Sequence, residues 1–171
     1  MNLLMSLVAG ALLLTAQHPE MPPGMSHEEH LKQMQKDEAL EKRGAEAMGF
    51  GPEATTHHFR LTPTGGSIEV TVKNPADDKN LSAIRGHLRS IADEFARGQF
   101  DRPFQTHGEI PPGVAAMQAN AGKISYQYGD ISDGGAVRIE TSDPGLIQAV
   151  YAFIRYQITE HHTGDPLEDK R

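Results

Sequence analysis

Gly65-Gly-Ser-Ile-Glu-Val-Thr-Val-Lys-Asn-Pro75 and Gly134-Gly-Ala-Val-Arg-Ile-Glu-Thr-Ser-Asp-Pro144 are the stretches that decide the fold. In each, a diglycine turn leads into an alternation of apolar and polar residues, the pattern of a half-buried strand. A Pro-containing loop follows the strand, and an amphipathic helix follows the loop, over residues 81–98 and 143–162. The two stretches therefore predict an internal repeat of one strand-and-helix unit.

A second alternating segment precedes each of these stretches, over residues 55–61 and 123–129. Between the halves we expect an irregular loop over residues 99–113 and a short helix over residues 114–120. The order is therefore β-β-α-(α)-β-β-α. It predicts an α+β fold, in which a four-stranded antiparallel sheet carries both long helices packed on one face.

The apolar stripes of the two long helices should face that sheet. In the first helix the stripe is Leu81, Ile84, Leu88, Ile91 and Phe95, and in the second it is Ile147, Val150, Tyr151, Ile154 and Ile158. After a short gap, Ile84 aligns with Ile147 and Leu88 with Tyr151. Chance produces similar patterns in α+β proteins, so a true duplication and a coincidence both remain open.

Residues 1–16 form an apolar run that ends in small residues, the pattern of a secretory signal peptide cleaved near Ala16. The run is shorter than the roughly 20 residues of a membrane span, and it leaves no stable membrane insertion after cleavage. An uncleaved anchor is the alternative, since no Lys or Arg precedes the run. We expect a periplasmic or secreted protein with a His/Met-rich flexible or helical tail at 17–52, one domain at 53–166 and a disordered end at 167–171.

In the tail, Ser26 and Glu29 have the spacing of a capping box, which predicts a polar helix from about residue 27 to 43, ended by Gly44. His27, His30 and Met34 share one face of that helix. Thioether and imidazole donors together favour copper. A plain solvated linker explains the same residues without any metal.

Charge and composition exclude several classes of partner. The formal net charge is −7, which argues against binding of nucleic acid and against docking to anionic lipid. The 171 residues include no cysteine, so a metal site has to use His, Met, carboxylate or water. The protein partner, if there is one, is unknown at this level.

Four histidines are the candidate ligands of the domain: His57, His87, His107 and His161. His57 has the strand parity of Phe59, and His87 and His161 fall on the apolar stripes of the two long helices. His107 lies in the expected loop. Imidazole suits copper, zinc or haem iron, so the set predicts a metal centre if the four converge in space. The competing interpretation makes each a core histidine bonded to a backbone carbonyl.

Secondary candidates are His58, His162 and Met117, which could complete a site at its edge. No nucleophile elbow, phosphate loop or dinucleotide fingerprint occurs, so the sequence favours a binding protein over an enzyme. We therefore expect an exported metal-binding protein that takes copper or zinc, with haem as a further option. The alternative is a non-metal module of the cell envelope that binds a small ligand or a protein.

Residues 55–166 also resemble a family of small exported bacterial proteins without an assigned activity. The motifs that carry the resemblance are Thr55-Thr-His-His-Phe59, Ile84-Arg-Gly-His-Leu-Arg89, Phe95-Ala-Arg-Gly-Gln-Phe100, Thr106-His-Gly108, Asp143-Pro144 and Gln157-Ile-Thr-Glu-His161. Some members bear the name aspartate carbamoyltransferase, but this chain lacks that enzyme's Ser-Thr-Arg-Thr loop and is too short. The resemblance implies His57, His87, His107 and His161 as the set to test.

Overall fold

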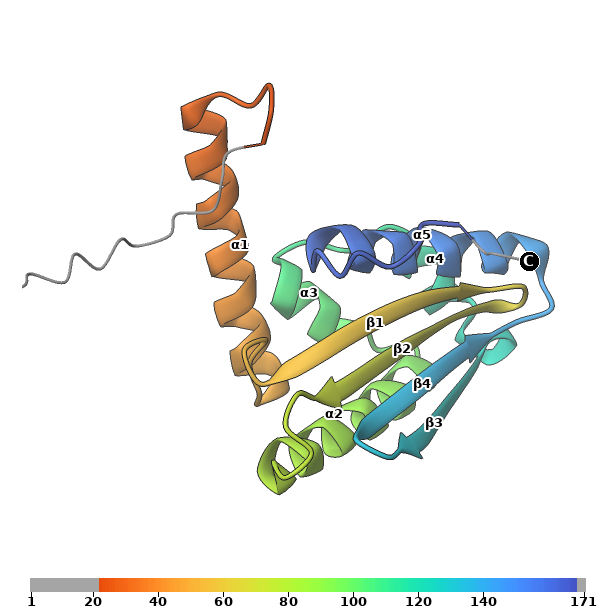
Figure 1. Cartoon of the computed structure of the whole chain (residues 1–171). Helices are drawn as coiled ribbons and strands as arrows, with labels where there is room; N and C mark the ends of the chain where they lie inside the picture. Colours follow the sequence, from red (N-terminus) through yellow and green to blue (C-terminus); the bar gives the residue numbers. More distant parts are fainter. Residues whose placement is uncertain (1–21, 169–171) are drawn as a thin grey trace, which may run out of the picture.

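A computed structural model describes residues 22–168 (Figure 1). In chain order its elements are α1 (His27–Met48), β1 (Thr55–Thr62), β2 (Gly65–Val72), α2 (Asp78–Ala96), α3 (Asp101–His107), α4 (Val114–Ala119), η1 (Ala121–Lys123), β3 (Ser125–Ile131), β4 (Gly134–Glu140) and α5 (Pro144–Glu160). The four strands form one antiparallel sheet in the order β1-β2-β4-β3. The expected α+β class and the β-β-α order of each half are confirmed.

The strand register is that of a two-fold symmetric pair of hairpins. In the first hairpin Thr62 pairs with Gly65, and in the second Ile131 pairs with Gly134, 69 residues further along in each case. In the central β2–β4 pair, Ile68 lies opposite Val137, again 69 residues away. A local axis between these two residues therefore relates the two halves of the sheet, as the sequence repeat predicts.

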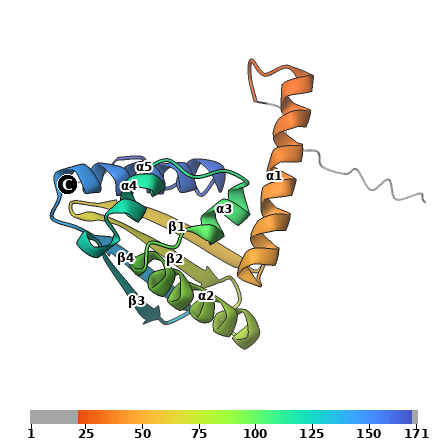
Figure 2. The same ribbon diagram turned by 180° about the vertical axis from the view of Figure 1, so that it is seen from behind.

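The long helices cover one face of this sheet, as the two opposite views show (Figures 1 and 2). α2 packs on β3 and β4, whereas α5 packs on β1 and β2. Each helix thus covers the hairpin of the other half. The core between helices and sheet is closed by residues that expose at most 1% of their surface, including Val70, Ile84, Val137, Val150 and Phe153.

The turns of both hairpins lie two residues earlier than expected. Residues 63–64 and 132–133 form the turns, and each diglycine begins a strand instead. The reason is steric. A Cβ on Gly134 would lie 1.9 Å from the carbonyl oxygen of Val70, and one on Gly65 would lie 2.1 Å from that of Ile139. The glycines therefore permit β2 and β4 to approach each other closely at both ends of their pairing.

The expected stripe of α5 is partly wrong. Tyr151 is only half-buried and donates a hydrogen bond to the carbonyl of Thr62, while Phe153 and Gln157 are buried in its place. The side chains of Asp77 and Asp143 cap α2 and α5. When the two helices are aligned so that Asp77 matches Asp143, the alignment is shifted by three residues from the expected one, which matched Ile84 with Ile147. In α2 the expected stripe holds except at Leu81, which is half-buried, and Ala92 joins it.

α1 begins as expected and ends later. Ser26 and Glu29 form the predicted capping box. The helix continues past Gly44 to Met48, and Gly49 ends it in a left-handed conformation with φ of 82°. Gly44 does not break the helix because it lies buried against α3, where a Cβ would come within 3.6 Å of Thr106.

The lower half of α1 and its linker belong to the packed domain. Leu40 and Phe50 expose 5% and 3% of their surface. The Arg43 guanidinium donates from Nε to the carbonyl of Thr106 at 2.9 Å, and so fastens α1 to the C-terminal end of α3. The segment assigned to the tail, residues 17–52, therefore contributes these two apolar side chains to the packed domain. None of the described helices is long and apolar enough to cross a membrane.

We expect Phe50→Ala to lower the free energy of unfolding by about 3–5 kcal/mol, because the ring is lost from a closed core. Chemical denaturation measures the change. Phe104→Ala is the control, since 49% of that residue is exposed, and it should change stability by about 0.5 kcal/mol or less. Equal effects of the two substitutions would show that Phe50 does not pack as described.

Candidate histidine-lined cavity

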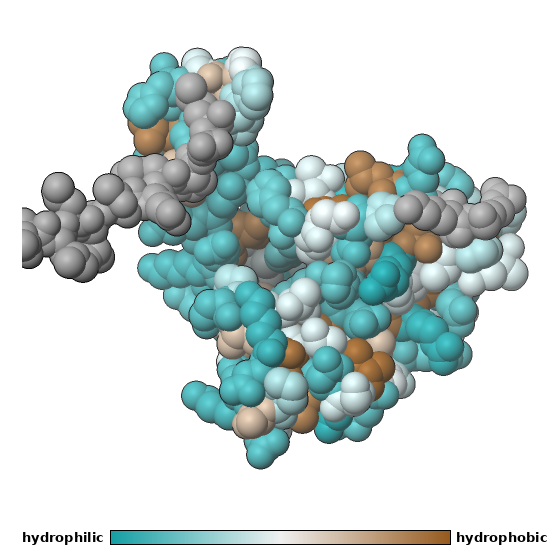
Figure 3. Space-filling view, in the orientation of Figure 1, coloured by the Kyte–Doolittle hydropathy of each residue, from teal (hydrophilic) through white to brown (hydrophobic). Residues whose placement is uncertain are grey.

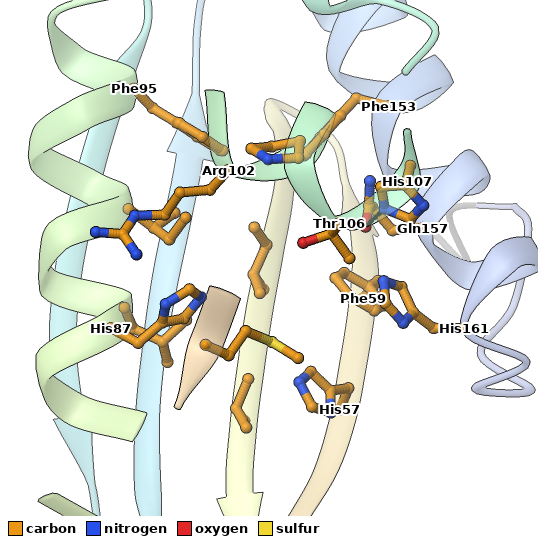
Figure 4. A pocket seen from close by; sticks show the side chains of 16 residues that line it. His57, Phe59, His87, Phe95, Arg102, Thr106, His107, Phe153, Gln157 and His161 are labelled. Carbon is orange, nitrogen blue, oxygen red and sulfur yellow. Dashed lines mark hydrogen bonds between the residues drawn. The ribbon is translucent and has the colours of Figure 1, made fainter. Parts of the chain in front are cut away.

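The four predicted histidines line one cavity of about 70 Å³ between the sheet, α2, α3 and α5 (Figure 4). His57 comes from β1, His87 from α2, His107 from the last turn of α3, and His161 caps α5. The remainder of the wall is mostly apolar, with Met48, Arg102, Thr106 and Gln157 as its polar or sulfur-bearing members. Among the described residues that line it, none is an aspartate or glutamate.

Three of the imidazoles form a contiguous group. The ring centroids of His57 and His161 are 6.0 Å apart, with nearly parallel planes, and those of His161 and His107 are 5.1 Å apart. His87 stands on the opposite wall, on α2 (Figure 4). Phe50 contacts both sides, since its ring lies 6.0 Å from that of His57 and 5.6 Å from that of His87.

His107 is placed by a helix that the sequence analysis assigned to a loop. Two guanidinium groups hold α3: Arg43 binds its C-terminal carbonyls, and Arg102 donates to both carboxylate oxygens of Glu94 on α2 at 2.8–3.0 Å. These contacts are tertiary, which explains why local pattern did not reveal the helix. They turn His107 toward α5, where its Nε2 lies 3.0 Å from Oε1 of Gln157.

Gln157 and Met48 are site residues that the sequence analysis missed. Gln157 is 5% exposed, which is unusual for an amide, and its Nε2 has no partner among the described residues. Its position on the buried stripe of α5, one turn before His161, was the available signal. Met48, the last residue of α1, gave no such signal because its place at the cavity depends on how α1 docks.

Burial keeps these imidazoles neutral. It lowers the pKa of His57 and of His87 to about 4 and that of His161 to about 3, and it also lowers the pKa of His107. Three fully buried ring nitrogens make no hydrogen bond within the described residues: Nε2 of His57, Nδ1 of His87 and Nδ1 of His107. The cavity thus presents neutral nitrogen donors that the protein itself does not satisfy.

We expect the metal-free protein to lose stability as the pH falls from 6.5 to about 4. In the unfolded chain each imidazole takes up a proton near pH 6.5, whereas in the fold His57 and His87 stay neutral down to about pH 4. The unfolded state binds more protons in this window, so each histidine lowers the free energy of unfolding by up to about 1.4 kcal/mol per pH unit.

Thermal denaturation at steps between pH 4 and pH 7, with a chelator present, measures this slope. His161→Phe serves as the comparison because it removes one titrating ring and keeps the volume filled. Its slope should be shallower than that of the parent protein. If the two proteins lose stability with pH at the same slope, His161 has the same pKa in the folded and unfolded states.

The secondary candidates do not reach the cavity. His58 points to the other side of β1, where Nδ1 bonds Asp165 at 2.9 Å. His162 is exposed and lies 3.4 Å from Asp37 of α1. Met117 is fully buried in the core on α4 and does not line the cavity. The tail candidates His27, His30 and Met34 lie on the projecting half of α1.

The side chains do not form a closed polydentate metal cage. Within residues 22–168, no group of three or more His, Asp or Glu side chains stands in a position to hold a metal ion. His87 lies across the cavity from the other three, and one nitrogen of His107 is engaged by Gln157. The cavity is also far below the roughly 300–1,000 Å³ typical of sites for large organic ligands, which disfavours haem.

Comparison of the chain with models of protein families, with curated proteins and with solved structures gives no match.

Proposed function

We propose that this protein is an exported copper-binding protein whose histidine-lined cavity takes a single Cu(I) ion. The observation that carries the proposal is a cavity whose described lining has buried imidazole nitrogens without a partner and no carboxylate within residues 22–168. A buried polar group without a partner costs about 1–3 kcal/mol, so several such nitrogens together favour a ligand that satisfies them. His57, His107 and His161 would supply the donors, with the thioether of Met48 at the same cavity.

The charge of the cavity supports a monovalent ion. Neutral imidazoles and a thioether offer no negative charge, and Arg102, the charged residue of the wall, is paired with Glu94. The Born cost of burying an ion grows with the square of its charge, so a neutral cavity favours a monovalent ion over a divalent one. Soft thioether and imidazole donors favour Cu(I) among monovalent ions.

The number of donors also favours Cu(I) over zinc. Structural zinc sites use four protein ligands and catalytic zinc sites use three. Cu(I) is satisfied by two or three soft donors. The ring centroids lie 5.1 and 6.0 Å apart, and no three of the described His, Asp or Glu side chains are already placed to hold an ion, so binding by two or three imidazoles would require the rings to reorient.

Gln157 would orient His107 for this role. A metal-binding histidine usually donates its other ring N–H to an oxygen, which fixes the tautomer. Oε1 of Gln157 is placed to accept from Nε2 of His107, leaving the lone pair on Nδ1. We expect Gln157→Leu to weaken Cu(I) binding by about 10–100-fold. Titration against a Cu(I) chelator of known affinity measures this, and unchanged affinity would remove Gln157 from the site.

Copper content tests the proposed function directly. Untagged protein exported by a bacterial host is loaded anaerobically with Cu(I) or with Zn(II), desalted and analysed for bound metal. The expected result is one Cu(I) that depends on His57, His107 and His161, and no Zn(II) that depends on them. If replacing these histidines changes the amount of neither bound Cu(I) nor bound Zn(II), the proposal is contradicted.

A second candidate is a small neutral molecule with both a donor and an acceptor. Within the described residues the amide Nε2 of Gln157 and Nδ1 of His107 have no partner, and they belong to two side chains that are hydrogen-bonded to each other. A cavity of about 70 Å³ limits such a ligand to a few non-hydrogen atoms. Mass spectrometry of the metal-free protein under native conditions would detect it as an added mass.

A further inference from the structure

A second cavity, of about 310 Å³, opens between α1, the start of β1 and the end of α5. We call it the vestibule, and Figure 3 shows the recess between α1 and the rest of the domain. It shares three lining residues with the histidine-lined cavity: Met48, His57 and His161. Any ion that reaches the vestibule therefore meets the donors of the inner cavity directly.

The vestibule is polar and acidic where the inner cavity is apolar and neutral. Asp37 and Glu41 enter it from α1, and Glu160 and His162 from the end of α5. Two side-chain contacts bridge these elements: Lys36 forms an ion pair with Glu160 at 2.8 Å, and His162 lies 3.4 Å from Asp37. Lys73 also lines the vestibule. Within the described residues, Asp37 and Glu41 are its carboxylates that are not paired with a lysine, while the inner cavity offers the softer donors.

One seam of α1 descends into this mouth. At spacings of three and four residues it carries His27, His30, Met34, Asp37, Glu41, Gly44 and Met48. At 100° per residue these positions fall within an arc of about 100°. The lower four line the vestibule, so the upper three lie in line above it on the same flank.

The composition of the seam is not that of a packing surface. A seam with this spacing ordinarily holds apolar residues. Here every side chain except that of Gly44 carries a nitrogen, sulfur or oxygen donor, and the glycine lies where α1 touches α3. His27 is exposed, and His30 and Met34 are half-buried, so the upper donors are accessible from solvent.

We propose that this seam is the intake of the inner cavity: His27, His30 and Met34 capture Cu(I) from solution and pass it through the vestibule to His57 and His161. This inference rests on the proposed function, because it needs the inner cavity to be the destination. It assigns His27, His30 and Met34 a role in the rate of loading and none in the final affinity. The ion moves by exchange of donors along the seam, with no change in its oxidation state.

The test measures loading rate and final affinity separately. Untagged exported protein is mixed anaerobically with the Cu(I)–bicinchoninate complex, whose absorbance falls as the protein takes the metal. The triple variant His27→Ala, His30→Ala, Met34→Ala should load about 10-fold more slowly, because it loses a local store of the ion. Its final His161-dependent affinity should equal that of the parent.

A matched triple variant controls for altered helix stability. Gln35→Ala, Lys42→Ala and Glu46→Ala change three exposed residues on the other face of α1 and should load at the parental rate. A seam variant that loads at the parental rate overturns the intake and leaves the proposed function standing. The intake is also overturned if the seam variant binds one Cu(I) fewer than the parent while its inner site fills at the parental rate. Absence of His161-dependent Cu(I) in the parent overturns both proposals.

Discussion

His161→Ala should abolish stoichiometric copper binding. His161 is the central imidazole of the cavity, with its ring 6.0 Å from that of His57 and 5.1 Å from that of His107. Losing an outer-sphere partner of a metal site weakens binding about 10–100-fold, so loss of this shared donor should weaken it by about 100-fold or more. Competition with a Cu(I) chelator measures the affinity.

The same substitution should remove the stabilisation that copper confers. A ligand held at 100 times its dissociation constant stabilises the native state by about 2.7 kcal/mol, which the parent protein should show as a higher melting temperature. His58→Ala is the matched control, because it deletes an imidazole on the other face of the same sheet, where Asp165 holds it. If both variants keep the copper-dependent shift, His161 is a packing residue and the proposed site is wrong.

Gly134→Ala should prevent stable folding, with a loss of about 4 kcal/mol or more. A Cβ at this position would lie 1.9 Å from the carbonyl oxygen of Val70 and 2.8 Å from its carbonyl carbon. Both atoms are backbone of the neighbouring central strand, so no side-chain rotation relieves the overlap. Circular dichroism during urea denaturation measures the loss, or shows that no cooperative transition remains.

Gly129→Ala provides the comparison, because this glycine lies in the adjacent hairpin strand and a Cβ there meets nothing within 4 Å. It should change the free energy of unfolding by about 0.5 kcal/mol or less. A Gly134 variant as stable as the Gly129 variant would mean that β2 and β4 pair less closely than described. The repeat predicts an effect of similar size for Gly65, which faces the carbonyl of Ile139.

Much of the sheet could be predicted because its information is local. Apolar and polar residues alternate along each strand, and the diglycine repeats 69 residues apart, so the amino-acid pattern alone indicates both hairpins. The end of α1 and the whole of α3 were not predictable in this way. Gly44 is tolerated only because α3 lies against it, and α3 is held by Arg43 and Arg102 through contacts with other elements.

The candidate site, too, was predictable from the sequence only in part. Strand parity and helical spacing report the direction in which His57, His87 and His161 leave their own elements, and that direction is correct for all three. They carry no information on the distances between elements. Only the tertiary structure places Phe50 in contact with both His57 and His87, and only it pairs His107 with Gln157.

By itself the sequence determined the α+β class, the repeated hairpins and the inward direction of three histidines, because periodicity fixes each side chain relative to its own backbone. The tertiary structure alone decided which imidazoles are neighbours, that Met48 and Gln157 join them, and that α1 lines the approach to them. These features depend on how α1, α3 and α5 pack together. The spacing of residues within one helix or strand does not determine its distance from another.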